Sequence, residues 1–181
     1  MPNWCSNLVT AFGTVEDIRA MERRINERES FLEGLLPQDK EWDYNEWVRI
    51  YGTKWTDSGT RCSVNENGNG QAVLICGFST AWAPPLEGVL SITEKWPTAT
   101  FGISFAEQGM GIFGYFIASN GTVHIDADVN EPDCGDWTED PDGAMDNYMA
   151  FEEDLNNMTS LATAVQHGWD AVGLMKSLAL D

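Results

Sequence analysis

One stretch of the chain, residues 71–111, sets the strongest limits on the fold. It opens with the nearly continuous apolar run AVLIC at residues 72–76, which is typical of a buried strand. Two prolines, residues 84–85, stop this strand and suit the first turn of a helix, because proline donates no backbone hydrogen bond. Apolar residues at helical spacing then predict a helix over residues 85–96, and residues 98–106 alternate as a strand. The sequence therefore predicts a strand–helix–strand unit.

The rest of the chain supplies elements that fit around this unit. Residues 14–28 predict an amphipathic helix, and residues 43–50 predict a short one. The glycine-rich turn at residues 67–70 predicts a hairpin. Further strands are predicted at residues 3–12, 60–65, 112–118 and 122–128. This order predicts an α+β class and a ferredoxin-like split βαβ antiparallel sheet, with two extra carboxyl-terminal strands and helices on one face.

Beyond residue 129 the chain changes character. Residues 130–143 form a polar, acidic loop with proline and glycine, and two helical segments are predicted after it. An apolar stripe at helical spacing marks the second segment: Met158, Leu161, Ala162, Val165, Trp169, Val172 and Met175. We expect this stripe to cover the open face of the chain's own sheet; a partner chain or a target protein is the alternative. The sequence thus divides into a ferredoxin-like domain, residues 1–129, and an acidic helical extension, residues 130–181.

The charge of the chain is its most unusual property. The 181 residues carry 29 acids and 10 bases, a net charge of -19. Residues 126–181 hold 14 acids and the single base Lys176. A phosphate-binding surface needs clustered Lys and Arg, so no direct binding to nucleic acid is predicted, and none to an anionic membrane.

Twelve carboxylates lie within residues 126–154, where the sequence has no Lys or Arg. We predict that they bind a partner protein: Asp126, Asp128, Glu131, Asp133, Asp136, Glu139, Asp140, Asp142, Asp146, Glu152, Glu153 and Asp154. Such a run presents a DNA-like array of negative charge to a basic groove, with fast, salt-sensitive association. The alternative interpretation is that the charge serves solubility alone.

No catalytic residue, cofactor or metal site is predicted, because none of the common catalytic or phosphate-binding motifs is present. Glu107 is the most plausible lone acid–base group, but we expect it to be a solvated residue beside a hairpin turn. Asp126 and Asp128 have the spacing that begins an EF-hand loop, yet Glu131 stands at the glycine position and Trp137 at the final ligand position. A loose divalent-cation site is the alternative.

The four cysteines, Cys5, Cys62, Cys76 and Cys134, have no metal-binding spacing. The sequence shows no signal peptide and no apolar run of about 18 residues that would span a membrane. We therefore predict reduced thiols in a cytoplasmic protein.

Five short blocks of sequence carry a family resemblance. They are MPNWCSN at residues 1–7, LLP at 35–37, YGTKW at 51–55, TAWAPP at 80–85 and AEQGMG at 106–111. In this order they resemble the YubB-type ferredoxin-like proteins of bacteriophages and conjugative plasmids. The resemblance covers roughly residues 1–125 and implies a ferredoxin-like domain of mobile-element origin. It carries over no catalytic residues, because the family has no established activity, and it stops before the acidic region.

Three functions follow as hypotheses. The first is a non-enzymatic phage or plasmid protein that binds and inhibits a host nucleic-acid-binding defence complex, of anti-CRISPR or anti-restriction type, in the bacterial cytoplasm. Its partner would be a host protein with a basic nucleic-acid-binding surface. The second is a structural or assembly module, with a homodimer formed through the carboxyl-terminal stripe or a sheet edge. The third is an enzyme whose site the motifs do not reveal.

Overall fold

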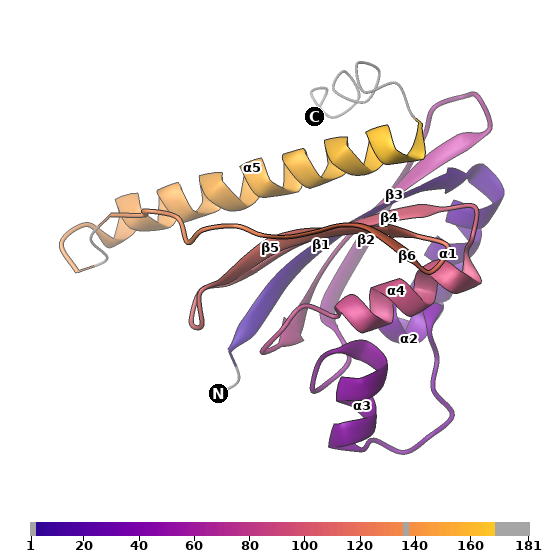
Figure 1. Ribbon diagram of the computed structural model, residues 1–181, viewed down its shortest axis with the longest axis horizontal. Coiled ribbons are helices and arrows are strands. Elements are labelled where there is room, and N and C mark those ends of the chain that lie inside the picture. Colours follow the sequence, from indigo (N-terminus) through magenta and orange to yellow (C-terminus); the bar gives the residue numbers. More distant parts are fainter. Residues whose placement is uncertain (1–2, 136–137, 169–181) are drawn as a thin grey trace.

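A six-stranded antiparallel sheet forms the centre of the computed structural model, which describes residues 3–135 and 138–168 (Figure 1). Its strands are β1 (Trp4–Thr14), β2 (Ser58–Glu66), β3 (Gln71–Ala81), β4 (Thr100–Glu107), β5 (Ile112–Ser119) and β6 (Thr122–Asp128). The helices are α1 (Val15–Arg28), α2 (Phe31–Leu35), α3 (Tyr44–Tyr51), α4 (Leu86–Lys95) and α5 (Pro141–His167).

The strand order, β2-β3-β1-β4-β5-β6, confirms the ferredoxin-like prediction. β1 lies between β3 and β4 and pairs antiparallel with both. The first four strands and the helices α1 and α4 therefore form the split βαβ pattern. β5 and β6 extend the sheet beyond β4 as a meander, so the two extra strands were also predicted correctly.

The main hydrophobic core lies between the sheet and the helices α1, α2 and α4. Alternation places Phe101 and Ile103 of β4 on this face, as predicted. α1 contributes Met21 and Ile25, and its amino terminus is capped by Thr14, whose hydroxyl accepts a hydrogen bond from the Asp17 amide at 3.2 Å. These helices cover one face of the sheet and leave the opposite face for another element.

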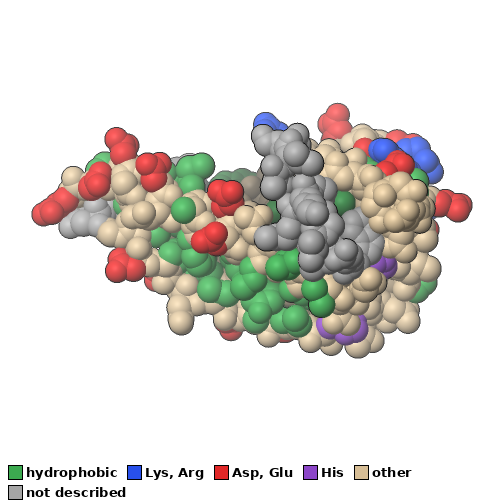
Figure 2. All heavy atoms as spheres, turned by 90° about the horizontal axis from the view of Figure 1, so that it is seen from above, with side chains coloured by type: hydrophobic (Ala, Val, Ile, Leu, Met, Phe, Trp, Pro, Cys, Tyr) green, Lys and Arg blue, Asp and Glu red, His purple; other side chains and the backbone are tan. Residues whose placement is uncertain are grey.

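α5 covers that opposite face (Figure 1). The prediction of two helical segments is wrong, because residues 141–167 form one helix of 27 residues. Asp140 caps its amino terminus, and the sequence from residue 144 to residue 167 contains no proline or glycine that would break it. α5 and the loop before it project beyond the sheet, as Figure 2 also shows from above.

The apolar stripe predicted to dock α5 is not its buried side, and Leu161 and Ala162 are only half-buried. Met158 and Val165 are 44% and 60% exposed, and Trp169, Val172 and Met175 lie outside the described residues. The buried side instead carries one leucine and small residues: Leu155, Thr159, Ser160, Thr163 and Ala164.

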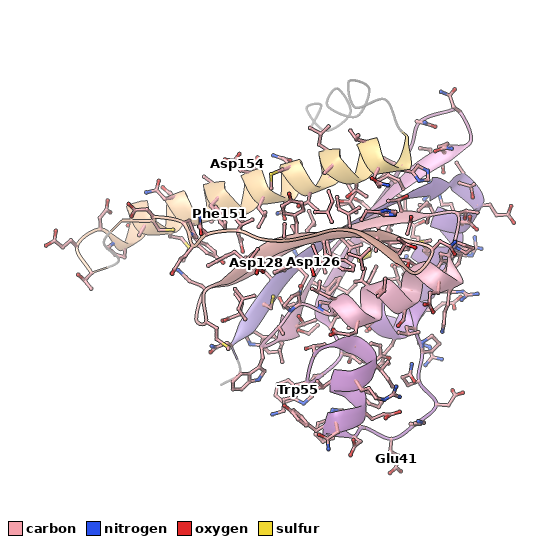
Figure 3. The ribbon with its side chains drawn as sticks, in the orientation of Figure 1. Glu41, Trp55, Asp126, Asp128, Phe151 and Asp154 are labelled. Atoms are coloured by element: carbon pink, nitrogen blue, oxygen red, sulfur yellow. A yellow bond between two sulfur atoms is a disulfide. The ribbon has the colours of Figure 1, made fainter. Side chains whose placement is uncertain are left out.

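The sheet beneath α5 explains why small residues face it. Thr10 of β1 shares a hydrogen bond of 2.8 Å with Ser160, and Ser104 of β4 donates one to Asn156. Gly102 allows α5 to lie very close to β4, because a Cβ atom on this residue would be 1.8 Å from Oγ1 of Thr163. Towards the amino terminus of α5 larger groups meet, and Phe151 packs on Phe113 of β5 with ring centroids 5.5 Å apart (Figure 3).

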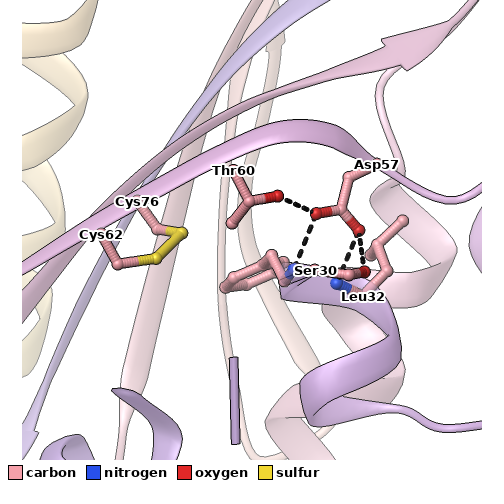
Figure 4. The surroundings of a disulfide bond; sticks show 7 residues. Ser30, Leu32, Asp57, Thr60, Cys62 and Cys76 are labelled. Atoms are coloured by element: carbon pink, nitrogen blue, oxygen red, sulfur yellow. Dashed lines mark hydrogen bonds between the residues drawn. A yellow bond between two sulfur atoms is a disulfide. The ribbon is translucent and has the colours of Figure 1, made fainter. Parts of the chain in front are cut away.

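The prediction of four reduced thiols is wrong for two of them. Cys62 and Cys76 are directly opposite each other on β2 and β3 and form a disulfide (Figure 4). The hairpin register brings together two residues that are separated by 14 positions in the sequence. Cys5 and Cys134 are free and buried.

A buried carboxylate beside the disulfide holds the start of α2. The Asp57 carboxylate accepts hydrogen bonds from the Ser30 hydroxyl at 2.6 Å, from the Phe31 and Leu32 amides at 2.6 and 2.9 Å, and from the Thr60 hydroxyl (Figure 4). A carboxylate that receives several donors at a helix amino terminus is strongly stabilised there. Asp57 therefore ties α2 to the strand that carries Cys62.

Candidate functional site

The predicted partner-binding carboxylates lie in two places rather than on one surface. The register of the sheet places Asp126 and Asp128 opposite Phe116 and Gly114. Phe116 belongs to the core that α4 covers, so these two carboxylates lie on the side of the sheet away from α5. Figure 3 shows the same separation: Asp154 lies on α5, whereas Asp126 and Asp128 lie on the other side of the sheet.

The other carboxylates belong to residues 130–154, which we call the acidic arm. Eight of its acids are exposed in the described residues: Glu131, Asp133, Glu139, Asp140, Asp142, Asp146, Glu153 and Asp154. Asp136 lies outside the described residues. Figure 2 shows carboxylates gathered on the part of the molecule that projects beyond the sheet. The sequence from residue 126 to residue 175 has no Lys or Arg, so this segment carries no balancing charge of its own.

Several of these acids have local structural roles. The Asp140 carboxylate accepts the Gly143 amide at 3.1 Å and thereby caps α5. The Asp133 carboxylate accepts the Gly135 amide at 3.2 Å in the preceding turn. Short side chains that accept hydrogen bonds from nearby backbone amides are common at helix caps and in turns. Asp140 and Asp133 therefore have local structural roles that do not require a partner protein.

Glu152 differs from the rest of the acidic arm because it turns towards the sheet. It lines a small hollow under α5 together with Ser6, Ser104 and Asn156. The Tyr148 hydroxyl donates a hydrogen bond to it at 3.1 Å, and burial raises its pKa above the ordinary value. Glu152 is three positions before the buried Leu155 on the same helix, so helical spacing could have predicted its inward position. Glu152 is therefore less exposed than the other described acids of the acidic arm, although it also borders the shallow surface of α5 that carries Asp146 and Glu153.

The side of α5 that carries Asp146 and Glu153 forms a shallow concave surface. Met149, Asn156 and Asn157 line it with them. Met149 is 60% exposed, so an apolar contact lies between the two carboxylates. Carboxylates around an exposed methionine suit the long side chains of Lys and Arg, which combine an apolar stem with a charged end.

Four of the five sequence blocks used for the family resemblance meet at one end of the sheet. The Asn7 amide donates to the Thr80 hydroxyl at 2.9 Å, which joins the first block to the fourth. The Thr53 hydroxyl donates to the Ala81 carbonyl at 2.9 Å, which adds the third block. Gly109 of the fifth block lies against Asn3, since a Cβ atom built on it would be 2.7 Å from the Asn3 side chain. These blocks therefore have a structural reason to occur together.

Glu107, at the same end of the sheet, is not solvated, and that prediction is wrong. The residue is only 2% exposed, and its carboxylate accepts the Gly109 and Met110 amides at 2.9 and 2.6 Å. It thus closes the turn between β4 and β5. Burial, followed by the nearby Glu107 carboxylate, raises the pKa of the Cys5 thiol to about 12. The Cys5 thiol is therefore protonated at neutral pH and unreactive as a nucleophile.

Residues 3–135 and 138–168 contain no group of three or more His, Cys, Asp or Glu side chains placed to hold a metal ion. Asp126 and Asp128, whose spacing matches the start of an EF-hand loop, do not belong to such a group within these residues. Among the helices of the described chain, none is long and apolar enough to cross a membrane.

Comparisons with known proteins place the chain in a family. Residues 51–148, just over half of the chain, match the ferredoxin-like domain in Api92-like protein. The match runs from the end of α3 to the first turns of α5, so it extends beyond residue 125 into the acidic arm. Among solved structures, the chain is similar to the protein api92 from Yersinia pseudotuberculosis, with 13% identity and a TM-score of 0.42. That similarity covers 55% of this chain and 39% of api92. A search of curated proteins found no match. The chain belongs to the family of ferredoxin-like domains found in Api92-like proteins.

Proposed function

We propose that this protein is a non-enzymatic, protein-binding module that places its acidic arm on the basic, nucleic-acid-binding surface of a host protein. The observation that carries the proposal is the exposure of eight acids on one segment that projects in part beyond the sheet and whose sequence has no Lys or Arg. A projecting structure enters a groove more readily than a flat one. Its negative charge would accelerate association with a basic surface and compete with nucleic acid for it.

The same proposal extends to the biological setting. The sequence resemblance to YubB-type proteins supports an origin in a bacteriophage or a conjugative plasmid. A mobile element meets host complexes that bind its nucleic acid, so inhibition of an anti-CRISPR or anti-restriction type would benefit it. The protein would then act in the bacterial cytoplasm, a reducing compartment in which a disulfide such as that between Cys62 and Cys76 is rare.

The experiment compares two variants with the same loss of charge. In the arm variant, Asp146→Asn, Glu153→Gln and Asp154→Asn neutralise three exposed carboxylates of α5. The control variant carries Glu16→Gln, Glu27→Gln and Asp39→Asn, which neutralise three exposed carboxylates far from α5 in the sequence. Each protein competes with labelled DNA for purified CRISPR effector and restriction complexes at low and high salt.

We expect the parent protein and the control variant to displace DNA from at least one complex, and the arm variant to do so about tenfold less well or worse. High salt should abolish the displacement. Equal displacement by the arm and control variants would show that net charge alone acts, and no displacement by any of them would reject the proposed target class.

A structural or assembly module is the second candidate. The exposed side of α5 carries Met158 and Val165, whose exposed fractions are 44% and 60%. Exposed apolar side chains along one helix are typical of a surface that pairs protomers. Light scattering after size-exclusion chromatography distinguishes the two: a dimer that Val165→Lys converts to a monomer supports assembly, and a monomer at high concentration argues against it.

A further inference from the structure

β6 is an edge strand whose pairing with β5 is regular over residues 125–128. Among the described residues it pairs with β5 alone, at the end of the sheet. Its register shift lies near its start, so residues 125–128 follow β5 without interruption. The opposite edge strand, β2, also carries a register shift near its start, between Ser58 and Arg61, so regularity does not distinguish the two edges. Irregular edges hinder pairing with another strand, whereas regular edges favour it.

The backbone groups of β6 that face outward can be assigned. The Val129 amide donates to the Phe113 carbonyl of β5 at 2.8 Å. In an antiparallel pair, residues alternate between facing the neighbouring strand and facing away from it. The backbone groups of residues 125, 127 and 129 therefore face β5, and those of Asp126 and Asp128 face the open edge.

The two faces of this edge differ in chemistry. Ile125 and Ala127 are opposite Ile117 and Tyr115, on the face that α5 covers. Figure 2 shows hydrophobic side chains gathered on that face. Asp126 and Asp128 are exposed on the other face. A strand added to β6 would therefore meet apolar side chains on one side and carboxylates on the other.

We infer that β6 pairs with an extended segment of a partner protein in which basic residues alternate with apolar ones. Alternate side chains of an added strand point to opposite faces. Its apolar residues would lie beside Ile125 and Ala127, and its Lys or Arg residues beside Asp126 and Asp128. A second copy of this chain fits less well, because antiparallel pairing of two β6 strands sets carboxylates against carboxylates.

This inference does not rest on the acidic arm, because it uses the backbone edge and both faces of β6. It predicts strand addition, whereas the proposed function predicts the docking of a projecting acidic segment. Either can fail without the other. The arm variant described above, with β6 unchanged, serves to separate them.

The test uses a short acetylated peptide in which Lys alternates with Val or Thr, and a peptide of the same composition with its Lys residues in one block. Two variants of β6 are compared. Asp126→Asn removes a charge and keeps the outward amide, whereas Asp126→Pro removes both. Proline is tolerated on an edge strand when its nitrogen faces solvent. Asp128→Pro is the second variant if Asp126→Pro does not fold.

We expect the alternating peptide to bind more tightly than the block peptide. The proline variant should bind it about fivefold more weakly than the asparagine variant, since one backbone hydrogen bond is lost. The arm variant should bind as the parent does. In the unchanged protein, hydrogen exchange at the Asp126 and Asp128 amides should slow when the peptide is added.

Three results would overturn the inference. Equal affinity for the alternating and block peptides would show that charge alone is recognised. Unchanged hydrogen exchange at both outward amides of the parent protein would show that no strand is added, whatever the affinity. A dimer in light scattering that Asp126→Pro dissolves would assign the edge to a second copy and reject the basic segment.

Discussion

Replacing Gly102 by alanine tests how α5 is held on the sheet. The new Cβ atom would lie 1.8 Å from Thr163 Oγ1 and 3.3 Å from Thr159 Cγ2, so α5 must shift or Thr163 must rotate. Rotation breaks the hydrogen bond of 2.7 Å from the Thr163 hydroxyl to the Thr159 carbonyl, which costs about 1 kcal/mol. Overpacking costs about 1–3 kcal/mol, and the reduced entropy of the unfolded chain offsets about 0.5 kcal/mol. We expect Gly102→Ala to lower the free energy of unfolding by about 1.5–3.5 kcal/mol.

Urea unfolding followed by circular dichroism measures this loss, with Gly77→Ala as the matched control. Gly77 lies in β3, and a Cβ atom there would meet only ordinary contacts, the nearest being Leu8 Cδ1 at 3.7 Å. The control should be neutral or slightly stabilising. Adding Thr163→Ala to Gly102→Ala should restore part of the lost stability, because the obstructing oxygen is gone. If Gly102→Ala is as stable as Gly77→Ala, α5 does not lie against β4 as described.

Three further predictions concern the same molecule. Leu155→Ala should cost about 2–4 kcal/mol in urea unfolding because Leu155 is buried, whereas Met158→Ala should change stability by less than about 0.5 kcal/mol because Met158 is 44% exposed. Reducing the disulfide between Cys62 and Cys76, which are 14 positions apart, should cost about 3 kcal/mol of stability, measured by unfolding with and without reductant; an unchanged midpoint would contradict it. Burial raises the folded-state pKa of Glu152 above its unfolded value, so the protonated Glu152 contributes fully to the stability of the fold below about pH 4, and this contribution is lost as the pH rises through the raised pKa. In urea unfolding between about pH 4 and pH 8, Glu152→Gln should therefore lose less stability than the parent protein.

Local patterns in the sequence were sufficient to predict the sheet and the helices α1, α3 and α4, but not the short helix α2. The alternation of Phe101 and Ile103 reports directly which residues face the core, since strand side chains alternate between faces. The cap at Thr14 likewise depends on residues three positions apart. Such features need no knowledge of distant parts of the chain, so the ferredoxin-like order followed from them.

The features that were missed depend on contacts between distant segments. The stripe containing Met158 and Val165 is apolar, but the sheet beneath α5 presents Thr10 and Gly102, which accept small side chains rather than large ones. The periodicity of the sequence shows where apolar residues recur, but it does not show which residues they contact in the folded protein. Close approach of the backbones decided the orientation of α5 instead.

The disulfide was missed because cysteine spacing was compared only with metal-binding patterns. The turn at residues 67–70 is centred almost midway between Cys62 and Cys76. Two residues equally distant from a hairpin turn are opposite each other in its strands, so this symmetry could have revealed the pair. Glu107 was missed for a related reason, because the backbone amides that it accepts become available only when the turn after β4 forms.

The acidic region itself was predicted as one surface, and the sheet divides it. Asp126 and Asp128 belong to a strand whose register directs them away from α5, while the acidic arm follows α5 over the opposite face. A single basic groove that covers the arm does not also contact those two side chains without passing around the sheet edge. That edge is β6, the strand whose outward backbone groups are open in the described residues. The acidic residues of this chain therefore form two separate surfaces rather than one continuous surface.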